Sequence, residues 1–196
     1  MRRTRRVAGP VAIATGAVVL TLGIASCGGG QSSHRHSSGP FAWLRPASAP
    51  HRWHIARTAT GLALSYPPGY RPIKTDPGTA SFALLGRGGA TTAYLNATPK
   101  QSTETLANWS RFRPAHNRDE GIRDVRVLAS SGDLTFRSGL GSCVIDTYTT
   151  SKARYREIAC LVSGTRSGGV VVAAAQAGQW NRYAATLQRA VSSFDP

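Results

Sequence analysis

Two neighbouring segments in the C-terminal third of the chain constrain its fold most strongly. Residues 142–149 and 154–162 have strand character, and Ser151 and Lys152 lie between them. The pattern predicts a β-hairpin with these two residues as its turn. In that register Cys143 lies opposite Cys160 at a non-hydrogen-bonded site, where cross-strand Cβ atoms come closest. We therefore expect a disulfide between Cys143 and Cys160.

The same register has one unfavourable consequence. It places Asp146 opposite Glu157, and like charges directly across a strand pair repel. The conflict would be relieved only if Arg154 or Arg156 lay between the two carboxylates.

The remaining segments predict an α+β fold in which helices pack on an antiparallel sheet. Short strands are expected at residues 53–55, 62–66, 79–85, 91–97, 125–128, 134–136 and 170–175. The glycines of residues 86–89 read as a hairpin turn, since they lack the Lys-Ser/Thr ending of a phosphate-binding loop. A first helix should begin at Ser102 or Thr103 and stop at Pro114, and an amphipathic second helix should cover residues 178–191. Phe194 is expected to close the end of the second helix.

The first 26 residues are typical of an export signal. Four arginines precede an uncharged, mostly aliphatic run from Val7 to Ile24. The segment Ile24-Ala25-Ser26-Cys27 resembles a bacterial lipobox, in which the cysteine is lipidated and becomes the first residue of the mature protein. Ordinary signal cleavage beside a lone cysteine is the alternative. Lipidation of Cys27 would hold the protein on the extracytoplasmic face of the cell membrane, because several acyl chains anchor a protein almost permanently.

The chain after the signal divides into a linker and one domain. Residues 27–52 are rich in Gly, Ser and Pro and predict a flexible tether. Phe41, Trp43 and Leu44 are more apolar than a linker requires, so they either enter the membrane interface or pack on the domain. Residues 53–196 are long enough for a single hydrophobic core.

The charge of the chain favours an anionic partner. Basic residues number 24 and acidic residues nine, and only four of the basic residues lie in the signal. Such a surplus suits phospholipid headgroups or acidic wall polymers. The predominance of arginine over lysine is also what a GC-rich genome would produce. Export makes nucleic acid an unsuitable partner.

No residue pattern in the domain predicts catalysis, a cofactor or a metal site. His34 and His36 lie in the tether without cysteine or carboxylate neighbours, which a metal site would need. The domain itself has His54 and His116, and neither stands in a nucleophile motif. We expect a protein that is not an enzyme, although a cleft joining either histidine to a carboxylate would favour catalysis.

Two stretches of the domain resemble the PsbP-like family, and in particular the LpqN/LpqT-type lipoproteins of actinobacteria. The first is residues 61–70, Gly-Leu-Ala-Leu-Ser-Tyr-Pro-Pro-Gly-Tyr, and the second is the C-terminal helix with Trp180, Leu187 and Phe194. Tyr70 stands where the family more often has Trp. The resemblance implies an antiparallel α/β sandwich and an accessory or scaffold role. It implies no catalytic residue.

These observations lead to three functional hypotheses. The first is a membrane-tethered accessory domain that binds an envelope protein or another envelope component. The second is a carrier of a small molecule or lipid, which would need a large apolar cavity lined by Leu, Val and Trp side chains. The third is an envelope hydrolase without a recognisable motif.

Overall fold

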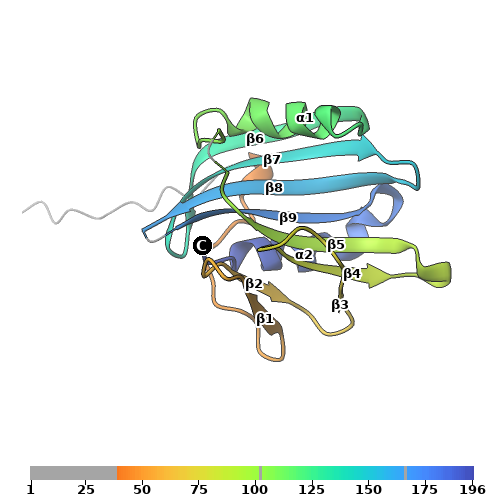
Figure 1. Cartoon of the computed structure of the whole chain (residues 1–196), viewed down its shortest axis with the longest axis horizontal. Coiled ribbons are helices and arrows are strands. Elements are labelled where there is room, and N and C mark those ends of the chain that lie inside the picture. The colour runs from red at the N-terminus through yellow and green to blue at the C-terminus, as the bar shows by residue number, and fades with distance from the viewer. Residues whose placement is uncertain (1–38, 102, 166) are drawn as a thin grey trace, which may run out of the picture. The chain divides into compact units, whose positions relative to one another are not determined.

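The computed structural model describes residues 39–101, 103–165 and 167–196. The signal, Cys27, His34 and His36 lie outside the described residues. The described chain is an α+β fold built on a seven-stranded antiparallel sheet with the order β3-β4-β5-β9-β8-β7-β6. Figure 1 shows helix α1 (Trp109–Asp119) on one face of this sheet and helix α2 (Trp180–Ser192), with the hairpin of β1 and β2, on the other.

The strands follow the predicted segments closely. Their bounds are β1 His54–Arg57, β2 Ala63–Tyr66, β3 Arg71–Pro72, β4 Ala80–Leu85, β5 Thr91–Pro99, β6 Arg123–Phe136, β7 Gly139–Thr149, β8 Arg154–Gly164 and β9 Gly168–Gln176. The glycine cluster between β4 and β5 forms the predicted turn, and Gly88 and Gly89 have positive φ there. The apolar run in β9 is the middle strand of the sheet, which explains why both of its faces are buried.

The hairpin of β7 and β8 has the predicted register. Cys143 pairs with Cys160, Ile145 with Ile158 and Asp146 with Glu157. A disulfide joins Cys143 to Cys160, and both cysteines are fully buried. The cross-link therefore ties two inner strands together within the core.

The sequence predicted two short strands between residues 125 and 136, and the structure has one long strand there. Strand β6 runs through the whole segment and pairs with β7 across three irregularities. Asp124 and Asp133 adopt positive φ at two of them. Extra residues in a bulge change the local backbone without ending the pairing, which is why the polar stretch looked like a turn.

The main core lies between the sheet and α2 (Trp180–Ser192). The inward residues of six strands, β4 to β9, form this core with Leu187, Ala190 and Val191 of the helix, and Phe194 closes its end. Phe41 and Leu44 belong to the same core, and the backbone amide of Ala47 donates to the carbonyl of Ser192. Of the two roles open to this apolar segment, packing on the domain is therefore the one observed. The packed chain begins near Gly39 rather than at Trp53, which shortens the predicted tether.

Helix α1 spans Trp109–Asp119 and differs from the prediction at both ends. It begins later, because Thr105 and Asn108 bond each other's side chains and backbone amides in a turn that precedes the helix. It also continues past Pro114, which lies buried inside it. Proline removes one helical hydrogen bond, yet the packing of the neighbouring residues on the sheet outweighs that loss.

Candidate functional site

The face of the sheet under α1 is polar at its centre, unlike the face under α2. Four residues lie directly opposite one another across β7, β8, β9 and β5: Asp146, Glu157, Ala174 and Tyr94. The next row of the same face contains Val144, Ala159, Val172 and Asn96. Two carboxyl groups are thus built into the middle of a sheet, where charged side chains rarely lie without partners.

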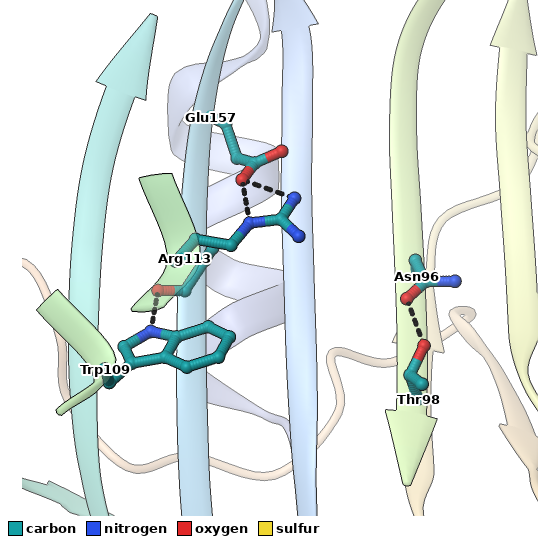
Figure 2. A network of polar contacts seen from close by, with 6 residues as sticks. Asn96, Thr98, Trp109, Arg113 and Glu157 are labelled. Carbon is teal, nitrogen blue, oxygen red and sulfur yellow. Dashed lines mark hydrogen bonds and ion pairs between the residues drawn. The ribbon is translucent and has the colours of Figure 1, made fainter. Parts of the chain in front are cut away.

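Arg113 of α1 is the partner of one of these carboxyl groups. Its Nε and Nη2 atoms lie 2.8 Å and 2.7 Å from Oε1 of Glu157, whose side chain is 1% exposed. Figure 2 shows the guanidinium beside this carboxylate, with two dashed lines to one of its oxygens. Arg113 therefore compensates for the buried charge, in place of the two arginines that the sequence suggested.

Arg154 and Arg156 have other contacts, so neither of them separates Asp146 from Glu157. The guanidinium of Arg154 lies 3.4 Å from the hydroxyl of Thr147. That of Arg156 stacks over Trp180, 4.7 Å from the ring centre, on the α2 side. Alternation along β8 explains this, because its even-numbered arginines point away from Glu157.

Asp146 is the second buried carboxyl group, and it has no hydrogen-bond partner among the described residues. Burial raises its pKa to about 7, and repulsion by Glu157 adds to the effect, while Arg113 and Arg118 oppose it. Its neighbour Tyr94 is also affected, since burial and the charge of Glu157 raise the pKa of Tyr94 to about 12. The centre of this face therefore contains one charged pair and a carboxyl group that titrates near neutral pH.

A groove of about 230 Å³ opens beside this cluster, between α1, the segment that precedes it and strands β5 and β9. Its apolar walls include Trp109, Phe112, Val170 and Val172. Trp109 is buried and donates from its indole nitrogen to the carbonyl of Ala159 at 3.0 Å (Figure 2). That bond fixes the ring, so the apolar wall of the groove is rigid.

The opposite wall of the groove is polar and also ordered. Asn96 donates to the hydroxyl of Ser81 at 2.7 Å and accepts from Thr98 at 2.7 Å. Figure 2 shows Asn96 and Thr98 on a strand across from Trp109 and Arg113. Threonine and glutamine side chains complete this wall: Thr75, Thr79 and Gln101. The groove is thus lined by aromatic and aliphatic side chains on one side and by hydrogen-bonding groups on the other.

Titratable groups also reach the groove, and they include one of the two candidate histidines. His116 lines it together with Asp76, Glu104 and Arg113. Glu104 is 4% exposed and accepts from the backbone amide of Gln101 at 2.7 Å. Among the described residues no hydrogen bond or ion pair joins His116 to a carboxylate; its ring stacks on Phe112 instead. His54 lies on exposed β1 beside Tyr66, away from this groove.

A second hollow lies on the same face and shares Tyr94 with the groove. It has a volume of about 300 Å³ and is lined by three tyrosines, Tyr94, Tyr148 and Tyr155, with Lys152 at the turn of the β7–β8 hairpin. The rings of Tyr148 and Tyr155 lie 5.8 Å apart, and the hydroxyl of Tyr155 donates to the carbonyl of Thr91. The α1 face of the sheet therefore has two neighbouring hollows, the groove and this one.

Sequence reasoning found the disulfide but missed the groove. The cysteine pair faces the α2 core and takes no part in either hollow. One signal of the groove was present, namely the buried Asp146–Glu157 pair that the register required. Within the described residues there is no group of side chains arranged to hold a metal, and no helix is long and apolar enough to span a membrane.

Comparison with known proteins identifies the fold. No family model and no curated protein matches the sequence. Among solved structures, cyanobacterial PsbP from Synechocystis matches with a TM-score of 0.54 and 14% identity, over 75% of this chain and 94% of that one.

Two further structures match with lower scores. A Pseudomonas aeruginosa protein of unknown function has a TM-score of 0.49 and 11% identity, over 74% of this chain and 97% of that one. LpqN of Mycobacterium tuberculosis, described as involved in cell envelope biogenesis, has a TM-score of 0.45 and 11% identity, over 75% of this chain and 93% of that one. The order of strands and helices, together with the match to cyanobacterial PsbP, shows that this chain has the PsbP-like fold.

Proposed function

We propose that this protein is a lipid-anchored binding domain on the extracytoplasmic face of the cell membrane, which holds part of an envelope component in the groove between α1 and the sheet. The observation that carries the proposal is the groove itself. A rigid aromatic wall faces ordered hydrogen-bonding groups across a small volume, which is the usual composition of a binding site. The lipobox at Cys27 supports the location.

The size of the groove limits what it can hold. Ligand pockets generally have volumes of roughly 300–1,000 Å³, and this groove has about 230 Å³. It suits a single ring, a side chain or a short polar segment of a larger molecule. A lipid carrier would need a larger and more uniformly apolar cavity, so the polar wall favours binding over carriage.

Filling the groove tests the proposal. Thr98→Tyr places a ring in the groove, and Thr60→Tyr adds the same ring at an exposed position in the β1–β2 turn. We would measure thermal stabilisation of the full protein by fractionated, protein-free envelope components. At least one envelope fraction should raise the melting temperature of both the wild type and the Thr60 variant. The same envelope fraction should leave the melting temperature of the Thr98 variant unchanged. Equal stabilisation of all three proteins would contradict a site in the groove.

Catalysis is the second candidate, because His116 shares the groove with Asp76 and Glu104. Binding and catalysis can be distinguished with the same envelope fractions. These fractions are incubated with the protein and then analysed by mass spectrometry. Under the binding proposal the components are recovered unchanged with both the wild type and His116→Ala. A product that forms with the wild type and is lost in His116→Ala would establish an enzyme and overturn the binding proposal.

A further inference from the structure

The layer of the protein that covers the α2 face of the sheet is rich in arginine and poor in acidic residues. Residues 39–70 and α2 together have five arginines and neither Asp nor Glu. The acidic residue of this layer is Asp195, which follows α2 and pairs with Ala63 of β2. From Asp76 to Gln176, by contrast, the chain has twelve basic and eight acidic residues. The layer on the α2 side is therefore more uniformly positive than the rest of the domain.

The charges of this layer are exposed and are not neutralised. Its most clearly exposed arginines are Arg45, Arg52, Arg57, Arg182 and Arg189, which we call the basic layer. Arg182 and Arg189 lie seven residues apart on α2 and so share its outer side. Among the described residues the one ion pair is Arg113–Glu157, on the other face of the sheet. The basic layer is thus a source of positive potential.

An exposed apolar side chain lies within the same layer. Ile55 on β1 is 52% exposed, the largest exposed fraction among the large hydrophobic residues of the described chain. Arg52 and Arg57 flank it in the sequence, and Trp53 beside it is only partly buried. Apolar and aromatic side chains among basic ones are typical of surfaces that bind the headgroup region of a bilayer.

We propose that the basic layer docks on the surface of an anionic lipid bilayer, with Ile55 entering the headgroup region. Each arginine held near such a surface contributes favourably through the negative surface potential. An acidic polymer would also attract the charges, but it offers no apolar phase for Ile55. Docking in this way turns the α1 face, with its groove, away from the membrane. The proposal does not depend on whether the groove has a ligand.

The experiment compares the two sides of the full chain on vesicles. Ile55→Cys reports on the basic layer, and Ala115→Cys reports on the outer side of α1. Each is labelled with an environment-sensitive fluorophore, and the unsubstituted chain provides the background from Cys27. Quenching by lipids with spin-labelled headgroups is measured on phosphatidylcholine vesicles and on mixtures with phosphatidylglycerol. We expect quenching at position 55 to rise several-fold with phosphatidylglycerol and to fall again with salt, while position 115 stays unquenched.

Charge-reversal variants show whether vesicle binding depends on the basic layer itself or only on the net charge of the protein. The double variant Arg182→Glu, Arg189→Glu should lower quenching at position 55 by more than half. Arg111→Glu with Arg118→Glu makes the same change in charge at the same spacing on α1, and it should leave quenching at position 55 unchanged. Equal quenching at both positions, or equal effects of the two double variants, would overturn the proposal. So would polygalacturonate, an acidic polysaccharide, if it altered the fluorescence at position 55 as strongly as the anionic vesicles.

Discussion

At the scale of single residues, the buried carboxyl groups under α1 are the least ordinary feature of this protein. Glu157 pairs with Arg113, and Asp146 lies next to them without a hydrogen-bond partner in the described chain. Replacing such groups by apolar ones of similar size often stabilises a protein. With these carboxyl groups the α1 face is less stable than it would be with apolar side chains of similar size, and such a loss of stability is common at functional sites.

Removing Arg113 should destabilise the protein strongly. Arg113→Met leaves Glu157 buried without a counter-charge, and breaking a buried pair in this way costs about 3–5 kcal/mol. Arg111→Met, on the exposed side of the same helix, should change the free energy of unfolding by less than about 0.5 kcal/mol. Denaturant titration measures both. A small loss in Arg113→Met would show that Glu157 does not need this partner.

Asp146 should make the protein less stable as the pH rises from about 4 to about 7. The pKa of Asp146 is raised from 3.8 to about 7 in the folded state, so the folded protein retains a proton that the unfolded chain releases. Stability falls wherever the folded state binds more protons, by about 1.4 kcal/mol for each unit of difference in pKa. The loss begins near pH 4 and is complete above pH 7.

Asp146→Asn tests this assignment, because it removes the titration and keeps the size of the side chain. The free energy of unfolding of the variant should vary with pH less than that of the wild type between pH 4 and pH 7. Asp133→Asn, at an exposed position, should retain the wild-type slope. If Asp146→Asn shows the full pH dependence, another group is responsible for it.

At the scale of elements, the hairpin of β7 and β8 connects the two faces of the sheet. They pair over eleven residues, contribute to both faces of the sheet and are joined by the disulfide. One face of this hairpin supports the α2 core, and the other carries the Asp146–Glu157 pair. The hairpin also holds one wall of the groove in place, since Trp109 donates to the carbonyl of Ala159 in β8.

Opening the disulfide should cost about 2–4 kcal/mol in the free energy of unfolding, because the bond closes a loop of 17 residues. We would compare the oxidised wild type with Cys143→Ala, Cys160→Ala in a denaturant titration. The register of the hairpin holds the two strands together in both proteins, so the fold should survive. Reaction of both cysteines with a thiol reagent in the native exported protein would show that they are not paired.

At the scale of the whole molecule, the two faces of the sheet differ in kind. The α2 side is covered by apolar packing under a basic layer, and the α1 side has the polar cluster and two hollows. Under the two proposals above, the α2 side would face the membrane and the α1 side would hold the ligand. The packing of Phe41 and Leu44 on the core also shortens the chain between Cys27 and the folded domain.

Lipidation of Cys27 lies outside the described residues and stays a prediction from the lipobox. Cys27→Ser should leave an uncleaved precursor or release the protein from the membrane, because the sulfur that accepts the lipid is lost. Mass spectrometry of the mature protein should find acylated Cys27 as its first residue. An N-terminus at another residue, without acyl groups, would show that the signal is cut by ordinary cleavage.

The sequence alone determined the features that depend on local pattern and on alternation. The register of β7 and β8, their cysteine pair, the buried strand β9 and the amphipathic helix α2 were all predictable, since each follows from periodicity within one or two adjacent segments. The PsbP-like fold was suggested by residues 61–70 and by the C-terminal helix. Boundaries failed where tertiary contacts outweighed local signals, as at Pro114 and along β6.

Only the tertiary structure decided which side chains share the groove. Asn96, Arg113 and Val172 come from three elements, β5, α1 and β9, and nothing local indicates that they line one groove. The choice of Arg113 over Arg154 as the partner of Glu157 shows why. Distance along the chain favours Arg154, but the direction of each side chain from the sheet and the position of α1 determine which guanidinium reaches the carboxylate.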